Sequence, residues 1–291
     1  MLKVYLVQFD SAKGHKSENL ARAKKMIFEA KPTAGSLVLL PEMFATGYVP
    51  ANLEDAAENF NTNCTGETAR MLSEVATETD CTIMGAGITK VSQADNDKFY
   101  NHISIYKPHE AQEFCGYNKM NLFFPEKESF KAGENINLFK LKEIPDHPRQ
   151  ARTGVGNDNK AESVSWTIAS FICYDLRFPE IFREATKKGA NLITIQAAWP
   201  AKRRAHWETL LRARAIENQV YIAAVNAVSE SSDQKLPLAG TSLIISPNGD
   251  ILAEGPTQSE AIISAELDRE AERDYRKSFP VLEGIVPPEL F

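Results

Sequence analysis

Residues 171–180, FICYDLRFPE, lead from a hydrophobic run through a polar turn into a segment that begins with proline. The run 165–172 has the length and composition of a buried strand, and proline suits the first turn of the helix expected at 179–188. A second hydrophobic run at 192–196 completes a β-α-β unit. Cys173 is therefore expected at the carboxyl end of a buried strand, which is where ligands bind in open α/β sheets.

The same alternation of strands and helices extends along most of the chain. Several hydrophobic runs are apolar on both faces, which is typical of strands in a sheet covered by helices. The last two strands are joined by Asn-Gly, a dipeptide of tight hairpin turns. Helices are expected at 18–30, 67–79, 179–188 and 205–219, and strands at 3–8, 35–40, 82–88, 103–106, 113–117, 165–172, 192–196, 220–226, 241–246 and 251–253. The sequence therefore predicts an α/β fold.

The composition indicates a soluble globular protein that acts on small molecules. The chain has 291 residues, of which 43% are hydrophobic, enough for a sizeable core. Its formal net charge of −6 and the lack of any block of basic residues argue against binding to nucleic acid or to an anionic membrane. No apolar run approaches the roughly 18 residues that span a bilayer, and the N-terminus turns polar too early for a signal peptide. A cytoplasmic location is expected.

The cysteines and histidines do not have the spacing of a metal site. No two cysteines form a C-x-x-C pair, and the five histidines lack ligand spacing such as H-E-x-x-H. We therefore expect no metal and no cofactor, and mostly reduced thiols. The cysteines are Cys64, Cys81, Cys115 and Cys173.

Two segments lack the pattern of a strand or helix. Residues 144–163 are rich in Pro, Gly, Asn and charge and lie between two strand signals, which predicts an exposed loop insertion within one domain of residues 1–291. The last twenty residues, 272–291, contain three prolines and predict a non-helical tail.

Three side chains far apart in the sequence form a coherent chemical set. Glu42 follows the buried run LVLLP, Lys119 lies among aromatic residues, and Cys173 ends a strand. Each residue taken alone has an ordinary structural interpretation. Glu42 would be a glutamate in a turn, Lys119 a lysine whose aliphatic stem packs, and Cys173 a buried cysteine. Together, Cys173 can attack a carbonyl carbon, Glu42 can take the thiol proton, and Lys119 with the Tyr174 amide can stabilise the oxyanion.

The segments that carry these residues resemble the three signature segments of the nitrilase superfamily, also called carbon–nitrogen hydrolases. The matching stretches are LPEMFATGY, YNKMNLF and FICYDLRFPEIFREATKKGANLI. The resemblance continues through AAWPAKRRAHWETLLRARAIENQVYIAAVN and AGTSLIISPNGDILAE, so it covers nearly the whole chain. It implies a four-layer α-β-β-α sandwich.

The resemblance also implies a Glu-Lys-Cys triad of Glu42, Lys119 and Cys173. The second glutamate of the family maps best onto Glu128, because E-S-F-K-A-G reproduces its spacing to an aromatic residue and a glycine. Glu126 is the alternative.

The resemblance further implies a homodimer through the helices at 179–188 and 205–219. In the second helix one apolar stripe is expected to serve this contact or to pack on the sheet. The stripe consists of Trp207, Leu210, Leu211 and Ala215, whereas Arg212, Arg214 and Glu217 are expected elsewhere on the helix surface.

The motif details are closest to ω-amidase-like enzymes, which release ammonia from small keto-acid amides through a thioester. A substrate carboxylate needs a cation, and Arg177 and Arg203 are the candidates. Their other interpretation is a surface or dimer salt bridge. Tyr48, Ala198 and Trp199 are candidates for the pocket wall. An N-carbamoyl amidohydrolase, an aliphatic amidase and a nitrilase are alternatives with the same triad.

Two rival interpretations use different residues or no chemistry at all. A Cys-His pair of the papain type would use His102 or His206 as the base, although the local cysteine signature of that class is absent. A catalytically silent scaffold that binds a metabolite or a partner protein is the non-enzyme alternative.

Overall fold

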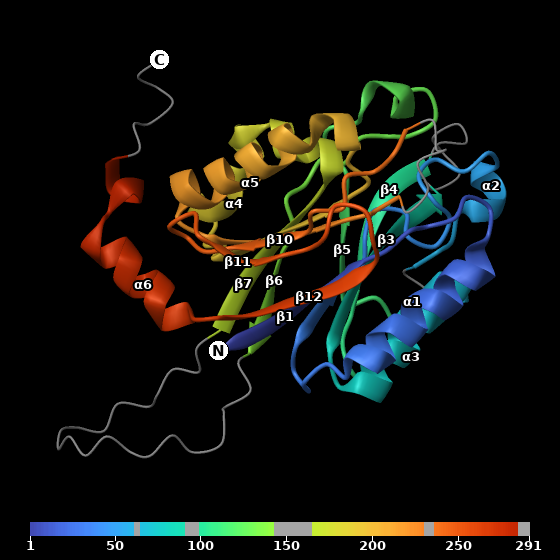
Figure 1. The fold of residues 1–291 in the computed structure, drawn as a ribbon, viewed down its shortest axis with the longest axis horizontal. Coiled ribbons are helices and arrows are strands. Elements are labelled where there is room, and N and C mark those ends of the chain that lie inside the picture. The colour runs from blue at the N-terminus through green and yellow to red at the C-terminus, as the bar shows by residue number, and fades with distance from the viewer. Residues whose placement is uncertain (61–64, 91–98, 143–164, 230–235, 285–291) are drawn as a thin grey trace.

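The computed structural model describes residues 1–60, 65–90, 99–142, 165–229 and 236–284. Within these ranges two six-stranded sheets face each other, and helices cover the outer face of each sheet (Figure 1). The expected four-layer α-β-β-α sandwich is therefore confirmed. The predicted loop insertion 144–163 and Cys64 lie outside the described residues.

The first sheet contains the N-terminal strands and the last strand of the chain. Its order is β12-β1-β2-β3-β4-β5. The neighbours of β2 run parallel to it, and the other pairings are antiparallel. Helices α1 (Lys16–Ala30) and α3 (Glu67–Thr79) cover its outer face. The strands are β1 (Leu2–Gln8), β2 (Leu37–Leu39), β3 (Thr82–Lys90), β4 (Phe99–Tyr106), β5 (Cys115–Asn118) and β12 (Ala261–Leu267).

The second sheet has the order β11-β10-β9-β8-β7-β6. Its central strands β7, β8 and β9 are parallel, as the β-α-β pattern predicts. Helices α4 (Pro179–Lys187) and α5 (Arg204–Asn218) cover its outer face. The strands are β6 (Leu138–Lys142), β7 (Ser165–Ile172), β8 (Leu192–Ala197), β9 (Tyr221–Asn226), β10 (Leu243–Ile245) and β11 (Ile251–Glu254).

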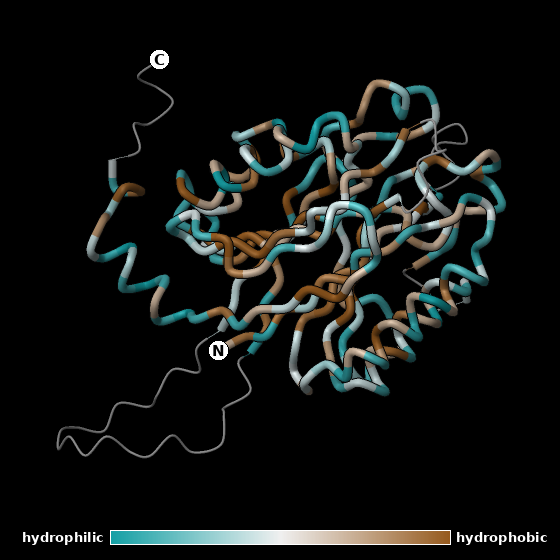
Figure 2. The backbone as a smooth tube through the Cα atoms, viewed as in Figure 1, coloured by the Kyte–Doolittle hydropathy of each residue, from teal (hydrophilic) through white to brown (hydrophobic). Residues whose placement is uncertain are grey.

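The main hydrophobic core lies between the two sheets. Strand β4 illustrates the alternation that builds it, because successive side chains of a strand point to opposite faces. Ile103 and Ile105 pack with residues of the second sheet, whereas Tyr106 packs with the residues under α1 and α3. Figure 2 accordingly shows hydrophobic residues along the facing strands and hydrophilic residues along much of α1. Asn101 shares the face of Ile103 and therefore points toward the second sheet.

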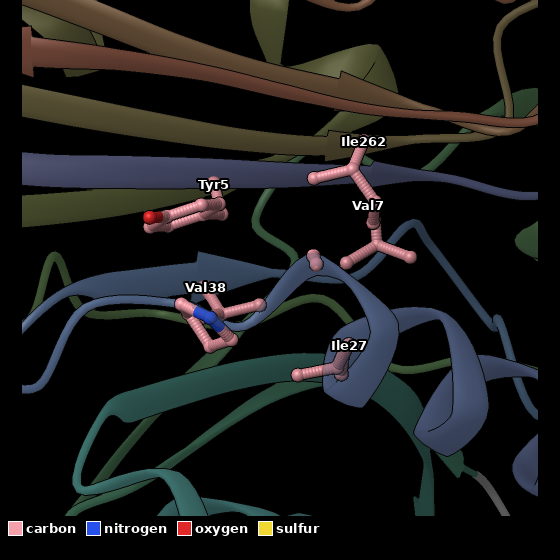
Figure 3. Close-up of a pocket in the computed structure, with 7 residues that line it drawn as sticks. Tyr5, Val7, Ile27, Val38 and Ile262 are labelled. Carbon is pink, nitrogen blue, oxygen red and sulfur yellow. The ribbon is translucent and has the colours of Figure 1, made fainter.

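A small hollow lies between α1 and the first sheet (Figure 3). Its lining is apolar apart from the Tyr5 hydroxyl, and no charged side chain is among the lining residues. Its walls are formed by Tyr5, Val7, Ile27, Ala30, Pro32, Val38 and Ile262.

The C-terminal part of the chain corrects the sequence prediction. Strand β12, which the sequence analysis missed, pairs antiparallel with β1 along its whole length, from Leu2 opposite Leu267 to Gln8 opposite Ala261. Helix α6, Arg269–Ser278, also extends into the predicted non-helical tail 272–291, so that part of the prediction is wrong. The helix forms because the Asp268 side chain accepts hydrogen bonds from the first free backbone N–H groups, and the three prolines come only after it.

Helix α6 is tied to the end of α5. The Arg276 Nε donates to the Gln219 carbonyl at 3.0 Å, and the Gln219 amide donates back to the Phe279 carbonyl at 2.7 Å. The segment therefore belongs to the folded unit and extends to one side of the sandwich (Figure 1). Short additional elements are α2 (Leu53–Ala56) and a 3₁₀ turn at Val281–Gly284.

The apolar stripe of α5 packs against the rest of the same chain. Trp207, Leu211 and Ala215 are fully buried against the second sheet, so they are not free to form a dimer contact. The expected surface position of Arg214 is wrong, because its guanidinium donates to the Leu176 carbonyl at 2.9 Å and is 5% exposed. No helix in the described ranges is long and apolar enough to cross a membrane.

Candidate active site

The site is built where β7 ends at Cys173. The residue has a φ of +44°, in the left-handed region that non-glycine residues seldom adopt. It also opens the 3₁₀ helix Cys173–Arg177, so the chain turns sharply at the thiol. Strain of this kind persists only where the surroundings fix the backbone. The thiol is thereby held at the carboxyl end of the strand, as the sequence predicts, and the residue is 9% exposed.

Lys119 follows β5 of the first sheet and is completely buried. Its backbone N–H donates to the Asn101 carbonyl at 2.9 Å, which fixes the start of the loop. Its ammonium donates to Glu42 Oε1 and to Glu126 Oε1, both at 2.9 Å. A buried ammonium needs such partners, since an unpaired charge is costly away from water.

Glu42 follows β2 and reaches across to the second sheet. Its side chain is fully buried, and its Oε2 accepts a hydrogen bond of 2.9 Å from the N–H of Ala198, which follows β8. The same N–H lowers the pKa of the Cys173 thiol slightly, against the larger effects of burial and of the Glu42 charge. Lys119 contacts Glu42 directly, and the charges of both act on the Cys173 thiol, so the structure brings together the three residues of the predicted triad.

The second glutamate beside the lysine is Glu126, and the preference for Glu128 is wrong. Glu126 ends the 3₁₀ helix Phe124–Glu126, which turns its carboxylate inward. Its Oε2 accepts from the Phe123 N–H at 2.8 Å, and its Oε1 accepts from the Tyr48 hydroxyl at 3.3 Å. Glu128 lies beyond this turn and is exposed. The spacing of Glu126 and Glu128 in the sequence could not show which of the two side chains the 3₁₀ turn points toward Lys119.

Asn101 of β4 is a site residue that the sequence analysis missed. Its side-chain amide donates to Glu42 Oε1 at 2.8 Å and to Glu126 Oε1 at 3.2 Å. Asn101 and Lys119 therefore both donate hydrogen bonds to the two carboxylates, and these contacts hold the like charges close together. A buried asparagine on the apolar face of a strand is a signal that could have identified it.

The electrostatics of the cluster favour a neutral thiol and a charged lysine. Burial and the Glu42 carboxylate raise the pKa of Cys173 well above its ordinary value, and the Lys119 charge opposes them only in part. Burial alone would lower the pKa of Lys119, but Glu42 and Glu126 raise it well above the ordinary value. Burial likewise raises the pKa of Glu126. Cys173 therefore needs a base to become a nucleophile.

Arg177 lies against two of the other residues expected to bind substrate, Trp199 and Tyr174. The Arg177 guanidinium lies 4.6 Å from the ring centre of Trp199 and 5.7 Å from that of Tyr174. Burial and the nearby charge of Arg203 lower the pKa of Arg177. Within the described ranges, neither arginine has a carboxylate within ion-pair distance. Two positive charges therefore act on each other here without a neighbouring carboxylate in the described ranges.

The histidines of the rival Cys-His interpretation have other partners. The His102 ring nitrogens lie 2.7 Å from Asn118 Oδ1 and 2.6 Å from Glu113 Oε1, and His102 stacks on Phe60. On β4 it follows Asn101, so it points to the opposite face of the sheet. His206 lies 3.4 Å from an Arg177 nitrogen. The charged groups that act on the Cys173 thiol are thus Glu42, Lys119 and Glu126, and neither histidine is among them. Among the described residues, no group of three or more His, Cys, Asp or Glu side chains could hold a metal ion.

Comparison with known proteins agrees with this geometry. The family model described as carbon–nitrogen hydrolase matches residues 3–277. The chain belongs to the carbon–nitrogen hydrolase family. Among curated relatives, the 2-oxoglutaramate amidase of Bacillus subtilis is 34% identical over 96% of this chain and 95% of its own length. The omega-amidase NIT2 of Xenopus tropicalis is 32% identical over 91% of this chain and 88% of its own.

Solved structures of the same superfamily share the sandwich. Nit3 of Saccharomyces cerevisiae, a nitrilase-superfamily member, has a TM-score of 0.76 and 25% identity, with 100% of this chain and 97% of its own covered. A CN-hydrolase superfamily protein of Xanthomonas campestris has a TM-score of 0.78 and 26% identity, with 98% of each chain covered. The predicted resemblance to amidases of this family is thus confirmed.

The free protein is expected to hold Cys173 as a neutral thiol. The ultraviolet absorbance difference between the protein and its Cys173→Ala variant should contain no thiolate band at neutral pH, because burial and the charge of Glu42 raise the thiol pKa. Glu42→Gln removes that charge and should move the titration midpoint to lower pH. A thiolate band at neutral pH in the unmodified protein would contradict this account.

Proposed function

We propose that this protein is an ω-amidase, which hydrolyses the terminal amide of a small keto acid and releases ammonia. The observation that carries the proposal is the buried set of Glu42, Lys119 and Cys173 beside two arginines that lack carboxylate partners in the described ranges. The names of the curated relatives point to the same class of substrate.

The first step forms a bond between the Cys173 sulfur and the amide carbon. Glu42 takes the thiol proton as the sulfur attacks, because the thiol is neutral in the free site. The carbonyl oxygen becomes an oxyanion, which the Lys119 ammonium and the backbone N–H of Tyr174 stabilise. Tyr174 is the second residue of a 3₁₀ helix, and the first N–H groups of a helix have no partner within it.

The second step breaks the carbon–nitrogen bond. The proton on Glu42 moves to the amide nitrogen, since an amide anion is a poor leaving group, and ammonia departs to leave a thioester on Cys173. Glu42 then takes a proton from water, which attacks the thioester. The second tetrahedral adduct collapses to release the acid, and the proton returns to the thiol.

Glu126 has a supporting role in this scheme. Its Oε1 holds the Lys119 ammonium at 2.9 Å, and its Oε2 is occupied by the Phe123 N–H. It therefore fixes the position and the charge of Lys119 rather than exchanging protons with the substrate. Tyr48, whose hydroxyl donates to Glu126, forms part of the pocket wall.

Arg177 and Arg203 are proposed to bind the substrate carboxylate. Two cations close together are unfavourable without a counter-ion, and an anionic ligand relieves their repulsion. A guanidinium matches a carboxylate with two parallel hydrogen bonds. Stacking on Trp199 orients the Arg177 plane for this contact. An uncharged amide or nitrile would gain nothing from this pair, which favours substrates that carry a carboxylate. N-carbamoyl amino acids also carry one, and the names of the curated relatives favour the keto-acid amides over them.

Three further expectations stay as proposals. We propose one domain, a cytoplasmic location in keeping with the free thiols of Cys81 and Cys115, and a homodimer through α4 and α5. Because the α5 stripe is buried within the chain, such a dimer would use the outward faces of these helices, where Ile216 is 47% exposed.

The substrate class is tested by ammonia release from a panel of amides and a nitrile. We expect Cys173-dependent release from 2-oxoglutaramate and 2-oxosuccinamate, and little from aliphatic amides, an N-carbamoyl amino acid or an aliphatic nitrile. Cys173→Ala is the control. Release confined to another compound would reassign the substrate, and no release at all would favour the silent scaffold.

The identity of the second glutamate is tested with a matched pair of variants. Glu126→Gln should lower kcat/KM by about a hundredfold, because the partly freed Lys119 ammonium no longer meets the oxyanion correctly. Glu128→Gln, at an exposed position only two residues away, should change it by less than about twofold. The reverse order would restore the sequence-based assignment to Glu128.

Carboxylate recognition is tested by Arg177→Met. Loss of a charge-assisted hydrogen bond should raise KM for 2-oxoglutaramate about ten- to a hundredfold, while kcat/KM for an uncharged amide stays unchanged. Arg212→Met, at an exposed position on α5, is the matched control and should leave both values unchanged. An equal loss for charged and uncharged amides would rule out a carboxylate clamp at Arg177.

A further inference from the structure

Asp175 is a buried carboxylate that the proposed chemistry does not use. It lies two residues after Cys173 and is completely buried. Its Oδ2 accepts hydrogen bonds from the Ile172 N–H at 2.9 Å and the Tyr117 hydroxyl at 2.8 Å. Its Oδ1 accepts from the Asn121 backbone N–H at 2.8 Å and from the Asn121 side-chain amide at 3.0 Å. All four hydrogen bonds come from protein groups.

The donors come from both halves of the sandwich. Ile172 is the last residue of β7, immediately before the thiol, and so belongs to the second sheet. Tyr117 lies on β5 of the first sheet, and Asn121 lies in the loop that follows it. Tyr117 and Asn121 are each two residues from Lys119. The carboxylate therefore binds the segment that carries the nucleophile and the segment that carries the ammonium.

The network also reaches the residue next to the lysine. The Tyr117 hydroxyl, which donates to Asp175, accepts a hydrogen bond of 3.2 Å from the Met120 N–H. The Ile172 contact closes the turn around Cys173, whose left-handed backbone must be held by its surroundings. One side chain thus fixes the turn at the thiol and the loop around Lys119 at the same time.

We infer that Asp175 is a positioning residue that sets the separation of the Cys173 sulfur and the Lys119 ammonium. The oxyanion formed on attack must lie between these two groups, so this separation matters in the transition state more than in substrate binding. The inference rests on the proposed function only for its kinetic readout. The residue acts through the two segments and does not touch the substrate.

The geometry explains why an amide cannot replace this carboxylate. In Asp175→Asn one oxygen becomes an NH₂ group, which faces either the Ile172 N–H or the Asn121 N–H, depending on its orientation. Both are backbone donors that cannot rotate to accept, so one side of the link is lost in either case. Tyr117→Phe retains the shape of the side chain but removes the hydroxyl, and with it the hydrogen bond to Asp175 and the one from the Met120 N–H.

The test compares Asp175→Asn and Tyr117→Phe with a matched control. Glu58→Gln alters another buried carboxylate that accepts backbone N–H groups, those of Thr68 and Ala69 at the start of α3. For each protein one measures kcat and KM for ammonia release, Tm, and the Kd for succinic semialdehyde. The Cys173 S–H adds across the aldehyde C=O, so that a carbon–sulfur bond forms and the oxygen faces Lys119.

In Asp175→Asn we expect kcat to fall about a hundredfold and the aldehyde Kd to rise by a similar factor, with KM within about threefold. Tyr117→Phe should give about a tenfold effect on both. Glu58→Gln should lower Tm and leave kcat and the aldehyde Kd unchanged. Unchanged kcat and aldehyde Kd in a folded Asp175→Asn, or a KM that rises in parallel, would overturn the inference.

The measurements distinguish a failure of the role inferred for Asp175 from a failure of the proposed function. If Asp175→Asn does not fold, Tyr117→Phe decides, because a wild-type aldehyde Kd in that variant contradicts the role of the network. If the unmodified protein releases no ammonia from any amide, the proposed function fails. The aldehyde comparison still decides the role of Asp175, since addition to the thiol requires no amide substrate.

Discussion

The charge of Lys119, buried between Glu42 and Glu126, is the constraint on which the site depends. An ammonium in the interior is tolerated only when it is paired and its partners are themselves satisfied. Two carboxylates beside one lysine leave a net negative charge, which hydrogen bonds from neutral donors must stabilise. Asn101 and the backbone N–H of Ala198 supply those donors, so every segment that meets at the lysine is fixed by the same charge.

This constraint ties the fold to the chemistry. Glu42 and Lys119 follow strands of the first sheet, whereas Ala198 and Cys173 follow strands of the second. The apolar core between the sheets provides most of the stability, but it does not specify a position along the strands as closely as hydrogen bonds do. The links from Glu42 to Ala198 and from Tyr117 to Asp175 cross the gap and fix the two sheets relative to each other.

The same burial shapes the reactivity. In the free site the thiol pKa is raised, so Cys173 is kept in its less reactive form until a carbonyl can accept the sulfur. In the proposed reaction, attack moves negative charge from the carboxylate and sulfur toward an oxygen that faces an ammonium which is already in place. The lysine needs no reorganisation at that moment, which is the advantage of a preorganised site. Arg177 and Arg203 are proposed to bind the other end of the substrate.

The sequence by itself determined the α/β class and the family, and it identified the three residues proposed as the triad, because these depend on local patterns: hydrophobic runs, a cysteine at a strand end and three signature segments. Only the tertiary structure decided between Glu126 and Glu128, since the 3₁₀ turn that aims Glu126 inward is held by the lysine it contacts. It alone revealed Asn101, Asp175 and β12, whose partners lie far away in the chain. A hydrogen bond between distant segments leaves no periodic trace in either segment, so folding had to bring them together before their roles could be recognised.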